Sequence, residues 1–90
     1  MSGMLPLPAR LDLSAATQLL ADLKKLDGSI RLDASSVTHF GALGVQTIVA
    51  ASRAARARGD AFEINDPSEK MIEQMQIMGV THEQLVEGRT

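Results

Sequence analysis

The spacing of apolar residues predicts strands that alternate with helices along the chain. Residues 14–26 carry apolar side chains at the i, i+3, i+4 and i+7 positions of one helical face, namely Ala16, Leu19, Leu20, Leu23 and Leu26. Residues 29–33 alternate apolar and polar side chains, as a strand with one buried face does. A long helix with a stripe of small and branched residues then runs to Arg58; the stripe comprises Val45, Ile48, Val49, Ser52 and Ala55.

A second alternating stretch and a third helix complete the pattern. Residues 61–65 read as a strand in which Phe62 and Ile64 point to the same side. The third helix carries a stripe of Met71, Ile72, Met75 and Met78. This stripe is more typical of a core than of a groove that binds a ligand.

Polar residues and glycines mark the expected helix ends. Ser14 is the expected N-cap of the first helix. Asp66 as N-cap, Pro67 at the first helical position and Glu69 at the third form an Asp-headed capping box for the third helix, which should end at Gly79. These signals predict where the helices begin and end from local sequence alone.

Two prolines qualify the first apolar segment. Because proline has no N–H to donate, Pro6 and Pro8 restrict any strand there to a short one or one at the edge of a sheet. Residues 81–88 could hold one last helical turn around Leu85 and Val86. The element order predicts an α/β fold in which helices cover a largely parallel or mixed sheet, built as a single domain over residues 1–90.

Composition excludes several classes of function. The chain has 90 residues, nine basic against eleven acidic residues and a formal net charge of −2. A binder of phosphate backbones normally has a strongly basic face, and two Phe with no Trp or Tyr provide no stacking platform for nucleic acid. Cysteine is absent and no apolar run has the length of a membrane span. We therefore expect a soluble cytoplasmic domain without nucleic acid or membrane insertion.

The chain offers little material for catalysis. His39 and His82 have no Cys or carboxylate at ligand spacing, so we expect no metal and no cofactor. A dyad of His39 with Ser35 or Ser36 is conceivable, but an ordinary loop histidine is the more typical reading. The GxxG at residues 41–44 lacks the Lys-Ser/Thr that completes a P-loop. We expect a protein that is not an enzyme.

The arginines near the end of the long helix allow two interpretations. Arg53, Arg56 and Arg58 lie in the last part of the long helix. A solvated helix face is the simpler interpretation, and a surface that faces a partner is the alternative.

The stretch between the second predicted strand and the long helix carries a family pattern. Asp33, Ser35 or Ser36, and Val37 fit a strand end of the form D-x-S-x-V. Together with the helices that follow, residues 30–80 resemble the STAS domain of bacterial anti-sigma factor antagonists, and are most similar to small free-standing members encoded near chemotaxis genes. The resemblance implies a mixed four- to five-stranded sheet covered by about three helices.

The same resemblance assigns roles to the start of the long helix. In that family a D-S-[ST]-G-[LIV]-G motif follows the strand, and its hydroxyl residue is phosphorylated. The spacing places Gly41 at the family Asp, Ala42 at the phosphorylated residue, Gly44 at the family Gly and Gln46 at the last Gly. Because Ala42 has no oxygen, the resemblance implies a module that binds its partner without this switch.

The resemblance also implies a contact surface and a class of partner. The partner would be a GHKL-type anti-sigma kinase or another chemotaxis or stress-signalling protein; the alternative is a STAS subunit of a lipid or solute ABC transporter. Whether Phe40 and Leu43 are exposed or cap the core stays open. The expected contact residues are Ser36, His39, Phe40, Gly41, Ala42, Leu43 and Gln46. Phosphorylation at Ser35, Ser36, Thr38 or Thr47 is not expected.

Overall fold

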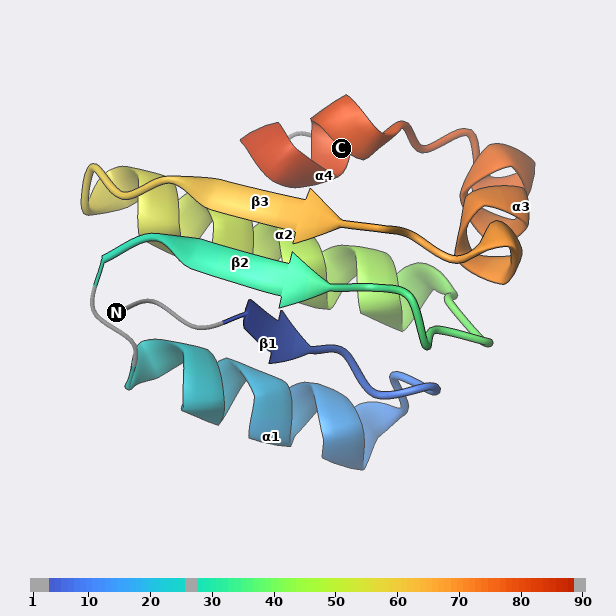
Figure 1. Ribbon diagram of the computed structural model, residues 1–90, viewed down its shortest axis with the longest axis horizontal. Helices are drawn as coiled ribbons and strands as arrows, with labels where there is room; N and C mark the ends of the chain where they lie inside the picture. Colours follow the sequence, from blue (N-terminus) through green and yellow to red (C-terminus); the bar gives the residue numbers. More distant parts are fainter. Residues whose placement is uncertain (1–3, 26–27, 89–90) are drawn as a thin grey trace.

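The computed structural model describes residues 4–25 and 28–88, in which strands and helices alternate up to the last two helices (Figure 1). The elements are β1 (Met4–Pro6), α1 (Leu13–Lys24), β2 (Ile30–Asp33), α2 (Ala42–Ala57), β3 (Phe62–Asn65), α3 (Glu69–Met78) and α4 (His82–Glu87). The described residues thus contain four helices rather than the three expected, because residues 82–87 form a separate short helix.

The sheet of the described residues has three strands in the order β1-β2-β3, and both neighbouring pairs are parallel. Leu5 pairs with Leu32, and Leu32 pairs with Ile64. The expected mixed sheet of four to five strands is not found there. The pairing is parallel because α1 and α2 each return the chain to the same end of the sheet before the next strand begins.

One face of the sheet is covered by helices and the other is polar. Ile30 and Leu32 of β2 and Phe62 and Ile64 of β3 are buried, which confirms the predicted alternation. Figure 1 shows α2 running behind the strands. On the opposite face, exposed Arg31 and Glu63 form an ion pair with an Nε–Oε2 distance of 3.2 Å. This face is charged and solvated, which is uncommon for a parallel sheet.

The two edge strands are protected in different ways. The N–H of Leu7 donates to the carbonyl oxygen of Asp33 at 2.8 Å, so Pro6 and Pro8 face the free edge, where neither has an N–H to offer. The prediction that the prolines mark an edge strand is confirmed. At β3, the His82 Nε2 lies 3.0 Å from the outward carbonyl oxygen of Ile64, and α4 covers this edge.

The predicted N-caps of two helices are wrong. Asp12, not Ser14, caps α1, and its Oδ1 accepts from the N–H of Ala15 at 2.9 Å. Ser68, not Asp66, caps α3, and its Oγ accepts from the N–H of Met71 at 3.1 Å. Asp66 has a φ of 51° and belongs to the turn before the helix. Each cap lies two positions from the predicted one because two suitable polar residues stand near each helix start.

The core lies between the sheet and the helices. The predicted stripe of α2 is buried throughout, and so are Ala16, Leu19 and Leu23 of α1, whereas Leu26 lies outside the described residues. In α3, Met71 and Met75 are buried and Ile72 is exposed. The Met71 and Met75 side chains therefore belong to the core, as the more typical interpretation of that stripe predicts.

Candidate functional site

The predicted site lies at the carboxyl end of the sheet. Residues 34–41 follow β2 and lead into the first turn of α2, and α3 lies beside this end of the sheet, on the right in Figure 1. Ligands of open α/β sheets bind outside the carboxyl ends of the strands. The loop and the first turn of α2 are therefore a suitable place for recognition.

The helix α2 begins without a side-chain cap. Gly41 is its N-cap in an extended conformation, and within the described residues no side chain caps it. The first helical hydrogen bond runs from the N–H of Val45 to the carbonyl oxygen of Gly41 at 3.1 Å. Backbone N–H groups of a first turn have no partner within the helix, and they give that end a partial positive charge. Ala42, at the first helical position, is exposed.

Gly44 is required by the packing of Phe40. A Cβ added at Gly44 would lie 2.8 Å from both Cδ1 and Cε1 of the Phe40 ring. The Phe40 side chain is only 1% exposed, so it caps the core and cannot serve as a contact for a partner. Leu43, the other side chain left open by the sequence, is 36% exposed. The expected contact surface therefore loses Phe40 and keeps Leu43.

Gln74 of α3 ties down the loop that precedes α2. Its Oε1 accepts from the N–H of Phe40, and its Nε2 donates to the carbonyl oxygen of Thr38 at 3.0 Å. The side-chain amide thus pairs with the loop as a neighbouring peptide group would. The sequence patterns did not identify Gln74 as a site residue. The signal that could have indicated it is a polar residue three positions after Met71, among the apolar residues of the stripe.

Ser68 makes a second connection between α3 and this loop. Besides capping α3, its Oγ donates to the carbonyl oxygen of Val37, and its N–H donates to the carbonyl oxygen of Ala34 at 3.1 Å. The loop is thus held by the first turn and the middle of α3. This fixes the backbone of residues 34–40 before any partner arrives.

The histidine of the loop contacts Thr38 and Arg10. The His39 Nδ1 lies 3.1 Å from the Thr38 Oγ1, and its Nε2 lies 3.4 Å from a guanidinium nitrogen of Arg10. The N–H groups of Thr38 and His39 both donate to the carbonyl oxygen of Ala9, at 2.8 and 3.1 Å. Among the described residues, the polar contacts of the His39 ring do not include Ser35 or Ser36, so a His–Ser dyad is not formed.

The hydroxyl groups near α2 differ in access. Ser35, Ser36 and Thr38 are exposed, whereas Thr47 is 4% exposed and its Oγ1 donates to the carbonyl oxygen of Leu43 at 2.7 Å. Hydrogen bonds from the Ser35 side chain and then its backbone lower the pKa of the Asp33 carboxyl, since they stabilise the charged form. Asp33, the last residue of β2, is therefore ionised rather than a proton donor at neutral pH.

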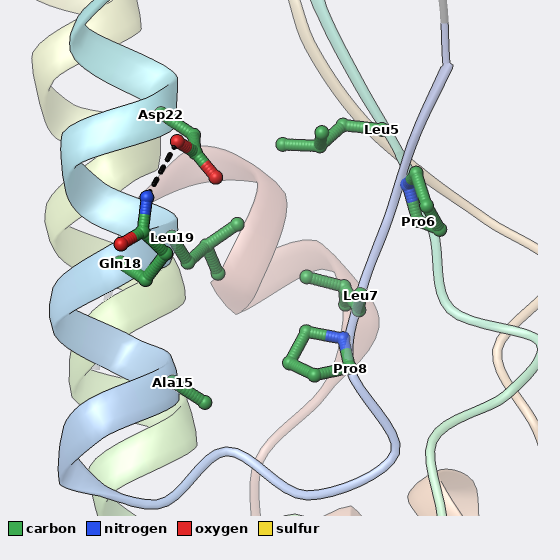
Figure 2. A pocket seen from close by; sticks show the side chains of 8 residues that line it. All are labelled: Leu5, Pro6, Leu7, Pro8, Ala15, Gln18, Leu19 and Asp22. Atoms are coloured by element: carbon green, nitrogen blue, oxygen red, sulfur yellow. Dashed lines mark hydrogen bonds between the residues drawn. The ribbon is translucent and has the colours of Figure 1, made fainter.

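Hollows lie at the β1 edge of the sheet and beside the start of α2. One, of about 350 Å³, lies between β1 and α1; Figure 2 shows Leu5, Leu7 and Pro8 facing Ala15 and Leu19 across it. At its rim the Gln18 Nε2 donates to the Asp22 Oδ1 at 2.9 Å. Its lining offers no nucleophile beside a base.

The other hollow, of about 430 Å³, adjoins the first turn of α2. Its lining residues come from two segments distant in sequence, Ala42, Val45 and Gln46 from α2 and Met78 and Val80 from the end of α3 and the turn after it. The sequence did not indicate Met78 or Val80 as part of the site. Only the tertiary fold brings these two segments to the same hollow.

The basic segment of α2 has contacts of its own at the opposite end of the helix. The Arg53 Nε donates to the carbonyl oxygen of Gly88 at 2.8 Å, and the Ser52 Oγ donates to that of Val86. Arg58 forms an ion pair with Asp60, with an Nε–Oδ2 distance of 2.9 Å. Two of the three arginines therefore make contacts within the domain.

The described residues, 4–25 and 28–88, contain no group of three or more His, Cys, Asp or Glu side chains that could hold a metal ion. In the same part of the chain no helix is both long and apolar enough to cross a membrane.

The comparison with protein families decides the classification. A family model described as "Mlab, STAS domain" matches residues 2–87, nearly the whole chain. The chain belongs to the STAS domain family. This confirms the resemblance seen in residues 30–80 and extends it to both ends of the fold. A search of curated proteins and a search of solved structures each found no match.

Proposed function

We propose that this STAS domain is a non-catalytic, cytoplasmic protein-interaction module of bacterial signalling. It binds a protein partner through the first turn of α2 and the loop before it. The observation that carries the proposal is the exposed Ala42 at the first position of a helix that has no side-chain cap. The expected partner is a GHKL-type anti-sigma kinase or another chemotaxis or stress-signalling protein.

The exposure of the loop and the first turn supports this proposal. Leu43 offers an apolar contact, and it is flanked by groups that can donate or accept hydrogen bonds. Because Gln74 and Ser68 already hold the loop backbone, a partner would lose little free energy in ordering it. The proposed contact residues that are exposed are Ser36, His39, Gly41, Ala42, Leu43 and Gln46.

The residue at the phosphoacceptor position sets the proposed mode of action. In the anti-sigma factor antagonists that the chain resembles, this position carries a hydroxyl. A phosphoryl group there would place a charge of nearly −2 on the docking surface. Ala42 cannot accept such a group. We therefore expect binding that is constitutive, with no phosphorylation at the start of α2.

A charge at residue 42 tests the proposal. Ala42→Glu should leave the free energy of unfolding within about 1 kcal/mol of the parent, because an acid near a helix N-terminus is tolerated or mildly stabilising. Burial of its carboxylate in an apolar contact should weaken the partner complex by about 3 kcal/mol or roughly 100-fold in Kd. Titration calorimetry with each GHKL-type kinase of the same genome measures this, and circular dichroism checks the fold.

Two further variants serve as controls. Ala42→Ser restores a hydroxyl with little change in shape, so binding should persist and mass spectrometry after incubation with kinase and ATP should detect one phosphoryl group. Arg56→Glu changes an exposed charge at the far end of α2 and should leave binding unchanged. The proposal is wrong if Ala42→Glu binds as tightly as the parent while Arg56→Glu does not. Binding to a transporter ATPase instead of a kinase would support the transporter alternative.

A further inference from the structure

The helix α3 exposes large apolar side chains beside the proposed docking site. Ile72 is 41% exposed and Ile77 is 83% exposed. Met78 and Val80 are half-buried, so part of each side chain is also accessible. Exposed apolar side chains that gather on one side of a small domain mark an interaction surface more often than scattered ones do.

Two hollows connect Ile72, Met78 and Val80, but not Ile77, to the start of α2. The first, described above, lies between Ala42 and Gln46 of α2 and Met78 and Val80. The second, of about 370 Å³, is lined among others by Ile72, Met75 and Val80. Val80 lines both, so the hollows form one surface, here called the Val80 band: Ala42, Gln46, Met78, Val80, Met75 and Ile72.

The surroundings of the Val80 band are acidic. Residues 66–88 contain five acidic residues and one basic residue, Lys70, whereas the whole chain has a net charge of only −2. On α3, Glu69 stands one helical turn before Ile72, and Glu73 directly follows Ile72 in the sequence. Both glutamates are exposed. An apolar surface with carboxylates at its side favours a partner that combines apolar and basic side chains.

We propose that the Val80 band binds an amphipathic, basic segment of the partner, with apolar side chains in the two hollows and Lys or Arg beside Glu69 and Glu73. The inference rests on the proposed function, because Ala42 and Gln46 belong to both surfaces, and it adds the chemistry of the partner. Amphipathic helices that lie in apolar grooves are a common mode of recognition. A second copy of this chain fits less well, because it would bring the same carboxylates into the interface.

The chemistry of the partner can be selected without knowing its identity. A display library of random 16-residue peptides is selected against the folded protein, and the binding site of enriched peptides is mapped by amide chemical shifts. We expect enriched peptides to combine Leu or Ile with Lys or Arg, and to shift amides of residues 42–46 and 69–80. Selection of acidic peptides, the absence of any binder, binding at the β1–α1 hollow, or dimerisation through this surface would overturn the proposal.

Matched variants then test the surface itself. Ile72→Ser and Met78→Ser should each weaken binding of the enriched peptides about tenfold. Gln76→Lys, at an exposed position that lines the second hollow, should repel a basic peptide and keeps the test valid if either of these variants unfolds. The double variant Glu69→Gln/Glu73→Gln should weaken binding about tenfold at low salt and less at high salt. The control, Asp22→Asn/Glu63→Gln, removes the same charge away from the band and should change nothing.

The pattern of results separates this inference from the proposed function. If Ala42→Glu weakens binding of the protein partner and the variants of Ile72, Gln76 and Met78 do not, the start of α2 binds a partner but the Val80 band does not. If the apolar variants weaken binding and Ala42→Glu has no effect, the band binds its partner and the role of Ala42 is wrong.

Discussion

The two ends of α2 differ in whether their polar groups are hydrogen-bonded to other parts of the domain. At the C-terminal end, Ser52 and Arg53 donate hydrogen bonds to the carbonyl oxygens of Val86 and Gly88, and so attach α4. At the N-terminal end, Gly41 provides no side-chain cap, and Leu43 remains exposed. The C-terminal end makes contacts within the domain, whereas the N-terminal end leaves Leu43 exposed and has backbone donors without a partner in the helix.

The difference shows that a charged segment is not by itself an interface. The last carbonyl groups of a helix lack partners within it, and the short α4 obtains donors from α2. Arg53 and Gly88 pack so closely that a Cβ added at Gly88 would lie 2.8 Å from the Arg53 Cγ. The arginine-rich segment therefore makes contacts within the domain. The less conspicuous Gly-Ala-Leu segment at the other end is the better candidate for recognition.

The largest expected effect on stability concerns Phe40. Phe40→Ala should lower the free energy of unfolding by about 3–5 kcal/mol, because it removes a buried ring and leaves a cavity above Gly44. Leu43→Ala, three residues later and exposed, should cost less than about 1 kcal/mol. Urea unfolding monitored by circular dichroism measures both. Equal losses would mean that the start of α2 does not separate core from surface as described.

A smaller effect is expected at Ser68, which links α3 to the loop before α2. Ser68→Ala should cost about 2 kcal/mol, because it removes both the cap of α3 and the donor to the carbonyl oxygen of Val37. Asp66→Gly is the control, and it should be close to neutral because Gly readily adopts the positive φ of that position. Thermal melts compare the stability of the two variants. A larger loss of stability for Asp66→Gly than for Ser68→Ala would indicate that Asp66 is the cap.

The smallest effect tests the opposite end of α2. Arg53→Met removes the donor to the carbonyl oxygen of Gly88 while it keeps most of the aliphatic stem, and should cost about 1 kcal/mol. Arg56→Met should lie within about 0.5 kcal/mol of the parent, as surface substitutions usually do. Hydrogen exchange of the amides of residues 82–88 should accelerate in the first variant alone. Acceleration in neither would show that Arg53 does not hold α4.

Local patterns were sufficient for most of the fold. The strands β2 and β3 and the buried stripes of α1 and α2 follow from periodicity, because the alternation of two and the spacing of 3.6 residues each expose one face to the core. The prolines correctly indicated an edge strand, since a missing N–H is tolerated only there. The expected count of four to five strands is not confirmed in residues 4–25 and 28–88, where the sheet has three; that count came from the family resemblance rather than from this chain's own pattern.

The candidate site was predictable only in part. The position of Ala42 and Gly44 at the start of α2 came from motif spacing, but the burial of Phe40 and the exposure of Leu43 depend on how α2 lies on the sheet. The bonds of Gln74 cross 34 and 36 positions of sequence. No local pattern carries such information.

The sequence by itself determined the α/β class, the buried faces of the helices and the absence of a hydroxyl at residue 42, since these depend on residue type and on spacing within one element. The tertiary structure alone decided which of two nearby polar residues caps each helix, and which apolar groups of α2 and α3 line the same hollow. The cap of α3 illustrates the reason. Ser68 is a cap whose hydroxyl also reaches the carbonyl oxygen of Val37. Such a group finds its second partner only once segments distant in sequence are packed together.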